Sequence, residues 1–289
     1  MKLRVPDYFD DFSCLAGACP HSCCMEWEVV LDEDTARRYR ALPGPLGERL
    51  RAAMQLDGED WCFPLRGGRC PFLNQENLCE VHLTLDEAAT SVTCREHPRF
   101  VEDYGTFREV TLSASCPEAN RLLLSSEAPL LFPERTDDTP AEAGDEWLTW
   151  LLPLRERMLA LLQNRTRPLN ARLRDILLLA QGVQERLDTE DEDALPELVE
   201  GPLPAHSAAP ETTGLFPYAL QFLETLEVLE PDWRDLLHQG EAAEPAPVSE
   251  ALLERIAAYF LFHYILKAVN DGDVLGQTQL CIFSVLTIR

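Results

Sequence analysis

Four cysteines near the start of the chain carry the clearest chemical signal in the sequence. Cys14, Cys19, Cys23 and Cys24 lie within eleven residues and follow the pattern C-x4-C-x3-C-C. Thiols at this spacing can close around one ion or cluster without long loops, and metal binding would then be coupled to folding of the segment. The pattern therefore predicts a metal site rather than a set of thiols buried only for packing.

Four further thiols complete the predicted set of metal ligands: Cys70, Cys79, Cys94 and Cys116. Eight thiols are enough for two four-ligand sites, or for one site with redox-active cysteines beside it. Neighbouring side chains of an extended chain point in opposite directions, so Cys23 and Cys24 share one metal only if the backbone turns there. Otherwise one of the two serves a second site or a catalytic role. All-sulfur ligation suits an iron–sulfur cluster or zinc, and the spacing leaves both open.

The composition indicates which partners and which cellular compartment to expect. The chain has 289 residues, with 25 basic and 50 acidic side chains and a formal net charge of −25, which disfavours binding to nucleic acid or anionic lipid. Residues 1–12 lack the apolar core of a signal peptide, and the most apolar stretch, residues 257–269, is too short to span a bilayer. We therefore expect a cytoplasmic protein, and a reducing compartment favours metal binding over disulfides. Cys62 and Cys281 are interpreted as ordinary thiols.

The positions of the cysteines divide the chain. Nine of the ten precede residue 117, which predicts a cysteine-rich metal or iron–sulfur domain over residues 1–125 and a second domain over residues 126–289. In the first domain, Asp32 is the expected N-cap of a helix over residues 33–42. Residues 101–104 and 107–112 are expected to form a small β-hairpin. Two further helices are predicted over residues 45–56 and 117–124.

The second domain is predicted to be a helical bundle. Leucine and aromatic residues recur there at helical spacing, in segments 147–163, 168–187, 216–229, 233–238, 249–269 and 274–288. Acidic, proline-containing loops are expected near residues 188–214 and 239–248. The expected fold class is therefore mainly α, with a cysteine-rich metal-binding N-terminal domain that holds a small β-hairpin, followed by the bundle.

A set of short motifs relates this chain to a known family. The motifs are Pro6 to Phe9, Phe12 to Trp27 with its four cysteines, Cys70 to Asn74, Leu78-Cys79, Thr93 to Arg95, Pro98-Arg99 and Ser115 to Ala119. In order and spacing they resemble the flagellin lysine-N-methylase family across about residues 5–125. The helical remainder is similar in character, with Tyr259-Phe260 and Asn270 to Asp273 matching more weakly.

The resemblance implies an enzyme that transfers methyl groups from S-adenosylmethionine to lysine ε-amines of a flagellin-like protein. It also implies an iron–sulfur cluster, most often of the 4Fe-4S type, held by cysteines of the motif, with zinc as the alternative. Neither a G-x-G turn after a strand nor the C-x3-C-x2-C triplet of radical enzymes is present, so the cofactor would bind by another surface.

Under this reading the segment from Thr93 to Arg99 is the expected wall of the cofactor site. Arg95 and Arg99 would hold the cofactor carboxylate through paired hydrogen bonds. The acceptor lysine must lose its proton before it attacks, and a carboxylate or tyrosine can take that proton. The candidates near the cysteines in sequence are Glu26, Tyr104, Glu109 and Glu118, and none is assigned.

Two other readings compete with the methyltransferase. A non-catalytic module that binds zinc, iron or an iron–sulfur cluster would explain the cysteines equally well. A redox sensor would need exposed thiols of low pKa, which metal ligation suppresses. The sequence does not identify the acceptor protein or the oligomeric state.

Overall fold

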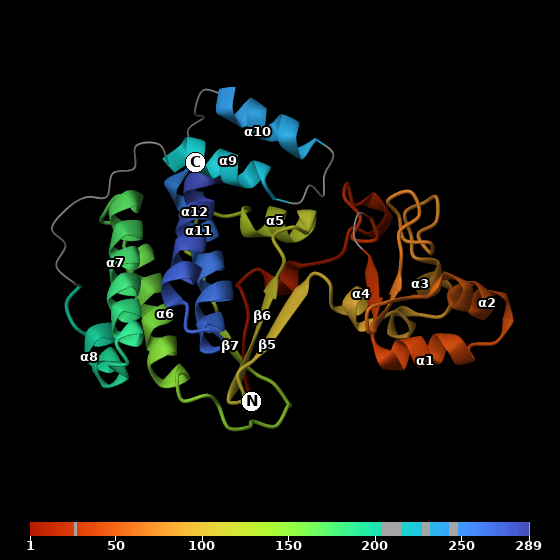
Figure 1. Ribbon diagram of the computed structural model, residues 1–289, viewed down its shortest axis with the longest axis horizontal. Coiled ribbons are helices and arrows are strands. Elements are labelled where there is room, and N and C mark those ends of the chain that lie inside the picture. The colour runs from red at the N-terminus through yellow and green to blue at the C-terminus, as the bar shows by residue number, and fades with distance from the viewer. Residues whose placement is uncertain (26–27, 204–214, 227–231, 243–247, 289) are drawn as a thin grey trace. The chain divides into compact units, whose positions relative to one another are not determined.

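A computed structural model of the chain describes residues 1–25, 28–203, 215–226, 232–242 and 248–288 (Figure 1). The chain forms two compact units. The helical unit comprises Met1–Asp7, Glu102–Glu109 and Leu123–Arg289, and the cysteine unit comprises Tyr8–Val101 and Val110–Leu122. The cysteine unit contains nine of the ten cysteines. The predicted domain boundary after residue 125 stays a prediction.

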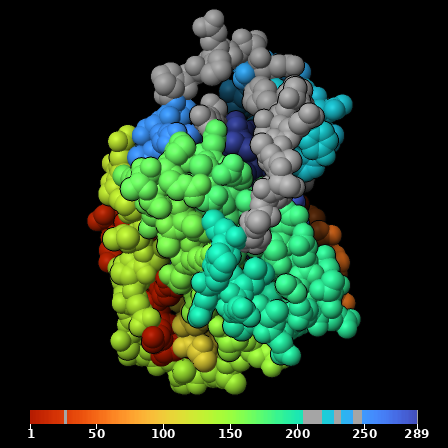
Figure 2. All heavy atoms as spheres, turned by 90° about the vertical axis from the view of Figure 1, so that its left-hand side faces the viewer, coloured from red at the N-terminus to blue at the C-terminus, as the bar shows by residue number. Residues whose placement is uncertain are grey.

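Helices dominate the chain, as the sequence predicted. In the helical unit these are α6 (Leu148–Leu162), α7 (Leu169–Asp188), α8 (Leu195–Glu200), α9 (Leu215–Glu224), α10 (Trp233–Ala242), α11 (Glu250–Tyr264) and α12 (Val274–Ile288). A short 3-10 turn, Ile265–Val269, extends α11. Helix α12 packs against α7 and α11, and α6 packs against the same two helices. Figure 2 looks onto the face that α7 and α8 cover.

Two of the expected loops are shorter than the sequence indicated. Within residues 188–214 the chain forms a 3-10 turn, Glu192–Ala194, and then α8. Leu195 and Val199 of α8 are buried, and this burial stabilises a helix despite the surrounding acids. Helix α10 likewise continues to Ala242, inside the loop expected near residues 239–248. Residues 204–214 and 243–247 of these loops lie outside the described part of the chain.

The predicted hairpin forms half of a four-stranded sheet. Its order is β5 (Arg99–Asp103), β6 (Phe107–Leu112), β1 (Lys2–Arg4) and β7 (Glu134–Thr136). The β5–β6 hairpin was predicted, and its turn contains Gly105 at a φ of +76°, where a Cβ atom would lie 2.3 Å from the Ala143 carbonyl oxygen. Strand β1 pairs in parallel with β6 and antiparallel with β7. Strands β1 and β7 have three residues each, which is too few to show an alternating pattern of apolar and polar residues in the sequence.

A buried arginine joins the sheet to the helices. The Arg155 side chain is fully buried, and its guanidinium donates to the Glu109 carboxylate at 2.5 and 2.6 Å. It also donates to the Phe262 carbonyl at 3.1 Å and lies 4.5 Å from the centre of the Phe262 ring. Since these groups belong to β6, α6 and α11, the ion pair fixes three elements of the helical unit.

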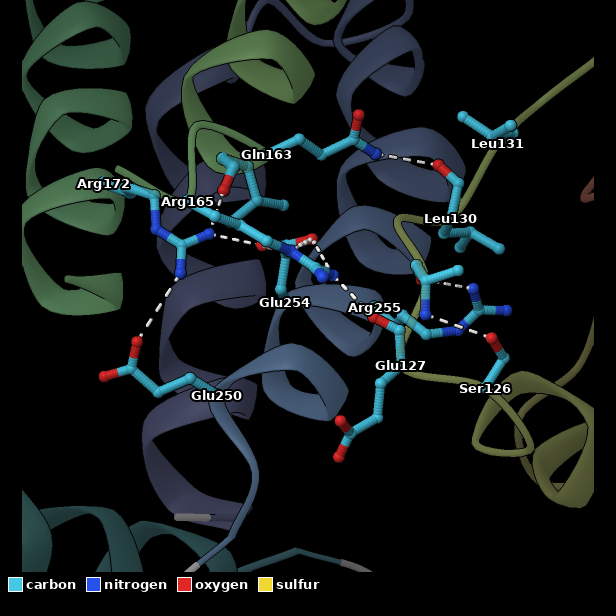
Figure 3. Close-up of polar contacts among 12 residues, drawn as sticks. Ser126, Glu127, Leu130, Leu131, Gln163, Arg165, Arg172, Glu250, Glu254 and Arg255 are labelled. Carbon is cyan, nitrogen blue, oxygen red and sulfur yellow. Dashed lines mark hydrogen bonds and ion pairs between the residues drawn. The ribbon is translucent and has the colours of Figure 1, made fainter. Parts of the chain in front are cut away.

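A second ionic cluster holds α11 against the α6–α7 connection (Figure 3). The Glu254 carboxylate on α11 is 1% exposed and lies 2.8 Å from the Arg165 guanidinium. Arg172 of α7 contacts the other Glu254 oxygen at 2.5 Å. Glu250, one turn earlier, is half exposed and lies 3.6 Å from Arg172. The buried carboxylate thus contacts two guanidinium groups, and their positive charge compensates the free-energy cost of removing the carboxylate from water.

The cysteine unit has its own small core. A three-stranded sheet has the order β2 (Val29–Leu31), β4 (Asp60–Phe63) and β3 (Gln55–Asp57). Its helices are α1 (Glu33–Ala41), α2 (Gly44–Ala53), α3 (Glu80–Thr84), α4 (Val92–Glu96) and α5 (Pro117–Leu123). The core contains Val29, Leu31, Tyr39, Leu50, Phe63, Phe72 and Val81, with Cys70 among them.

No helix within the described ranges is both long and apolar enough to cross a lipid bilayer. The cytoplasmic location stays a prediction.

Candidate functional site

Four cysteines from four segments of the cysteine unit line one small cavity. They are Cys24, Cys70, Cys79 and Cys94. The cavity has a volume of about 20 Å³, room for one water-sized species. Its other walls come from the core and from the turn before α4: Val29, Leu31, Tyr39, Phe63, Phe72, Val81, Thr90 and Ser91. The four thiols therefore line a partly open hollow whose surface is almost entirely apolar; Cys70 is buried, Cys24 and Cys79 are half-buried, and Cys94 is exposed.

Backbone hydrogen bonds hold three of these cysteines in place. The Cys70 amide donates to the Cys24 carbonyl at 2.8 Å, which joins segments far apart in sequence. Cys79 is the residue before α3, and it is linked to Leu73 by an isolated β-bridge. The Glu80 amide donates to the Phe72 carbonyl at 2.8 Å. The segment after Cys70 thus folds back so that Cys70 and Cys79 reach the same cavity.

A carboxylate places the fourth cysteine. The Asp32 side chain accepts from the Thr35 amide at 2.9 Å, the N-cap that the sequence predicted for α1. Its other oxygen accepts from the Val92 amide at 2.9 Å, at the start of α4. Burial opposes ionisation of Asp32, but these hydrogen bonds outweigh it and lower its pKa. One carboxylate therefore caps two helices, and α4 carries Cys94.

The apolar surroundings keep the lining thiols protonated while no metal is bound. Burial raises the pKa of Cys70 to about 12. Burial also raises the pKa values of Cys79 and Cys94. Metal ligation requires thiolates, so a bound cation would have to displace these protons and stabilise the resulting charge.

The remaining thiols of the N-terminal motif lie outside this cavity. Cys14 and Cys23 are exposed and Cys19 is half-buried. The Cys14 sulfur accepts from the Ala16 amide at 3.4 Å, and the Cys19 thiol donates to the His21 carbonyl at 3.0 Å. Cys116 is half-buried and is not part of the cavity lining.

Cys23 and Cys24 interact with each other through their side chains. A hydrogen bond from the Cys24 thiol lowers the pKa of Cys23, and the same contact raises the pKa of Cys24. Cys24 nevertheless lines the cavity, whereas Cys23 does not. Exposure does not separate the lining thiols from the others, because Cys70 is buried, Cys24 and Cys79 are half-buried like Cys19, and Cys94 is exposed like Cys14 and Cys23.

The donor atoms fit a thiolate-bound metal centre, but the ligand set is not closed. Sulfur from four cysteines around one cavity is the donor set of structural zinc sites and of iron–sulfur clusters. In the part of the chain that the structure describes, no three His, Cys, Asp or Glu side chains form a group that could hold a metal ion. The metal and its eight predicted ligands stay a prediction.

The two arginines expected in a cofactor site have different surroundings. Arg95 is half-buried, and its guanidinium donates to the backbone carbonyls of Ala88 and Thr90. Arg99 is exposed, and its guanidinium lies 5.9 Å from the Phe9 ring centre and 5.4 Å from the Phe12 ring centre. Ring contacts use the face of the guanidinium and leave its N–H edges available. Arg99 thus retains donors for an anionic ligand, whereas Arg95 has one nitrogen already bound to the turn before α4.

The candidate bases are dispersed. Glu118 forms an ion pair with Arg121 at 2.6 Å, and Glu109 is held by Arg155 in the helical unit. Burial raises the pKa of Tyr104, also in the helical unit. Glu26 lies outside the described residues. No general base is assigned from these positions.

Sequence reasoning missed three hydroxyl-bearing residues of the cavity lining. Tyr39, Thr90 and Ser91 line the cavity, and no motif marked them. Ser91 precedes α4 and accepts from the Cys94 amide at 3.2 Å, so the Ser-x-x-Cys spacing is an N-cap signal that could have indicated this helix.

Comparison with known proteins identifies relatives of the chain. It is 29% identical over 143 residues to proteins named Lysine-N-methylase from Salmonella choleraesuis (strain SC-B67) and Salmonella typhimurium. This chain is related to the lysine-N-methylases. The match covers 47% of this chain but only 36% of each methylase. The resemblance inferred from the cysteine motifs is thereby confirmed.

A third relative carries a flagellar name. The chain is 28% identical over 142 residues to the Flagellar biosynthetic protein FliU of Salmonella muenchen, in a match that covers 84% of that protein. No family model and no solved structure matches the chain. The relationship therefore rests on the lysine-N-methylases and FliU.

Proposed function

We propose that this protein is a protein-lysine N-methyltransferase that uses S-adenosylmethionine and acts on a flagellin-type protein. The observation that carries the proposal is the relationship to proteins named Lysine-N-methylase and to a flagellar biosynthetic protein. Because the match spans about a third of each methylase, the activity, cofactor and acceptor are inferences for this chain.

The charge of the chain suits a cationic acceptor. A formal net charge of −25 attracts lysine-bearing surfaces and raises the rate of encounter with them. An ammonium group has no lone pair for attack on a sulfonium methyl, so the lysine must be neutral when it reacts. Burial in an apolar site lowers a lysine pKa and favours that neutral form.

The cofactor site is proposed at Arg99. S-adenosylmethionine carries a carboxylate, and a guanidinium held by Phe9 and Phe12 can donate to it through two parallel hydrogen bonds. Arg95, the other predicted contact, is assigned a supporting role because it binds the carbonyls of Ala88 and Thr90.

The cysteine unit is proposed to hold a metal centre. Cys24, Cys70, Cys79 and Cys94 are the residues whose arrangement supports this assignment. A centre bound there would join four segments of the unit and, if it were an iron–sulfur cluster, would also carry electrons.

The second candidate function is a non-catalytic metal-binding module. The four-cysteine cavity favours it, because four cysteines from separate segments are the donor set of structural metal sites. Such a module would bind metal but would have no affinity for S-adenosylmethionine.

Cofactor binding tests the proposal. We expect isothermal titration of the anaerobically purified full chain with S-adenosylmethionine to show saturable binding. Arg99→Ala should weaken that binding about tenfold to a hundredfold, since a charge-assisted hydrogen bond contributes about 1.5–3 kcal/mol. The matched control is Arg37→Ala, since Arg37 is an exposed arginine of the same unit that pairs with Asp34. Its affinity should equal that of the unaltered chain.

Two results would count against this account. A chain that binds no S-adenosylmethionine would favour the non-catalytic module. Unchanged affinity in Arg99→Ala would remove Arg99 from the cofactor site.

A further inference from the structure

We infer that one face of the helical unit, formed by α9 and α12, docks a cationic amphipathic helix of the acceptor protein. The inference rests on the proposed function and deepens it, because it states which feature of the acceptor the chain recognises. Five apolar residues form this surface, which we call the docking face: Tyr218 and Phe222 of α9, Leu226 in the turn after α9, and Leu280 and Phe283 of α12.

Exposure of apolar side chains on α9 is the first support. Tyr218 is 65% exposed, Phe222 46% and Leu226 43%. Tyr218 and Phe222 are four positions apart and therefore lie on one side of the helix. The Leu226 amide donates to the Leu223 carbonyl at 3.3 Å, so the helical turn continues to Leu226, a further four positions along. Such a stripe exposed to water is stabilised when a partner covers it.

Continuity with α12 is the second support. Helix α9 packs against α12 (Figure 1), and the Phe222 and Phe283 rings meet edge to face with their centres 6.1 Å apart. Leu280 is three positions before Phe283, on the same side of α12, and is also exposed. Single exposed apolar residues are common on protein surfaces, whereas a continuous group of them is typical of an interaction site.

The charge beside the docking face is the third support. Residues 215–242, which include α9 and α10, contain six acidic side chains and one arginine. Helix α10 packs against α9. Three acids of this region are exposed: Glu224, Asp232 and Asp235. Helix α12 contains no charged residue. The docking face is therefore apolar with an acidic border on its α10 side, which is complementary to a partner whose apolar surface is bordered by lysine or arginine.

Spacing and charge together select the occupant. An amphipathic helix presents its own apolar residues three and four positions apart, and such residues serve as anchors when a helix docks into an apolar surface. A second copy of this chain would bring two acidic borders together, and the net charge of −25 opposes that contact. Anionic lipid is repelled for the same reason. A cationic amphipathic helix satisfies both the apolar and the electrostatic requirement.

Two designed peptides test the docking of a helix. The first is a leucine–lysine peptide of about 18 residues, roughly five helical turns, with every leucine on one face. The second has the same composition with leucines on all faces. We expect fluorescence anisotropy to show that the full chain binds the first peptide about tenfold more tightly than the second. Its affinity should fall as salt rises from about 50 mM to about 500 mM, because salt screens the acidic border.

Single variants of the full chain test the location. Leu226→Ser should weaken binding of the first peptide about tenfold, since it removes an apolar contact from the docking face. Leu131→Ser is the matched control, because Leu131 is an exposed leucine of the same unit outside the docking face. Its affinity should equal that of the unaltered chain. Photo-cross-linking of the first peptide to the unaltered chain, mapped by mass spectrometry, should label α9 and α12 and does not depend on the folding of a variant.

Methyl-transfer kinetics test whether the docked helix belongs to the acceptor. With a purified flagellin-type protein as acceptor, Leu226→Ser should raise the KM for the acceptor about tenfold and leave kcat unchanged, because Leu226 is proposed to contact only the docked helix. Leu131→Ser should change neither constant. An unchanged KM in Leu226→Ser would show that the docking face does not bind the acceptor.

Four binding results would overturn the inference. They are equal affinity for the two peptides, equal weakening in Leu226→Ser and Leu131→Ser, cross-links confined to other elements, and dimers of the unaltered chain that Leu226→Ser abolishes, which would assign the docking face to a second copy. Peptide binding is measured without S-adenosylmethionine. A chain that prefers the first peptide but transfers no methyl group would contradict the methyltransferase proposal alone, and a chain that transfers methyl groups without this preference would contradict the docking face alone.

Discussion

At the residue scale, the helical unit depends on carboxylates that are buried with arginine partners. The Glu254 side chain is 1% exposed and forms ion pairs with Arg165 and Arg172. The Glu109 side chain is 4% exposed and forms an ion pair with Arg155. Removing one member of such a pair leaves the other charge buried without compensation. The chain combines an acidic surface with a few buried acids that determine how its helices pack.

Replacing Glu254 tests this dependence. Glu254→Gln should lower the free energy of unfolding by about 3 kcal/mol, because two guanidinium groups lose their buried counter-charge. Glu250→Gln is the matched control on the same helix, since Glu250 is 51% exposed. Its effect should stay below about 1 kcal/mol. Urea unfolding, monitored by the helical circular dichroism signal, gives the free energy of unfolding of both variants. Equal losses of stability would show that burial of the carboxylate does not determine its contribution.

At the element scale, short connections position the thiol-bearing segments. Helix α4 has five residues and carries Cys94, and isolated helices of that length are unstable in water. Its first turn depends on Ser91, which accepts from the Cys94 amide, and on Asp32, which accepts from the Val92 amide. The Asp32 carboxylate, sixty positions before Val92, thus helps to position Cys94 at the cavity.

Removing that carboxylate tests its double role. Asp32→Ala should destabilise the cysteine unit by about 1–2 kcal/mol, since it removes one N-cap and a second helix contact. Hydrogen exchange measured by mass spectrometry should accelerate in the peptides that contain Thr35 and Val92. Asp34→Ala is the control, because Asp34 is highly exposed and pairs with Arg37 at the surface. Exchange that accelerates only at Thr35 would contradict the proposed link to α4.

The sequence predicted the long elements well and the short ones poorly. The bounds of α6, α7 and α12 agree with the predicted ones to within one residue, because an apolar stripe repeated over four turns is a strong signal. The helix predicted over residues 249–269 ends as α11 at Tyr264, and its last five residues form a 3-10 turn. Helix α8 lies in a segment whose acidic, proline-containing sequence predicts a loop, because its two buried residues are too few to show periodicity among acids. Strands β1 and β7 exist only through pairing with each other and with β6, which no local pattern encodes.

The candidate site was predictable by residue type but not by arrangement. The cysteines were recognised from their number and spacing alone. The proximity of Cys24 to Cys70 depends on a backbone hydrogen bond between segments far apart in the sequence, and the position of Cys94 depends on the contact of Asp32 with the Val92 amide. The separate surroundings of Arg95 and Arg99 likewise depend on contacts with Thr90 and with two phenylalanines. Such contacts follow from the fold and leave no local mark in the sequence.

At the scale of the whole molecule, two units with different chemistry share one chain. The cysteine unit contains nine of the ten cysteines and Arg99, and the helical unit contains the buried ion pairs and most of the helices. The chain has only two lysines, and both are in ion pairs, Lys2 with Glu134 and Lys267 with Glu102. Methylation of an added acceptor would therefore be easy to distinguish from methylation of the protein itself.

Methyl transfer to lysine is the most direct measurement of the central claim. The anaerobically purified full chain is incubated with S-adenosylmethionine that carries a deuterated methyl group and with a purified flagellin-type protein, and acceptor peptides are sequenced by mass spectrometry. The account predicts deuterated methyl groups on lysine ε-amines of the acceptor, and much less label with Arg99→Ala. An acceptor that stays unlabelled, although the chain has bound both metal and S-adenosylmethionine, would contradict it.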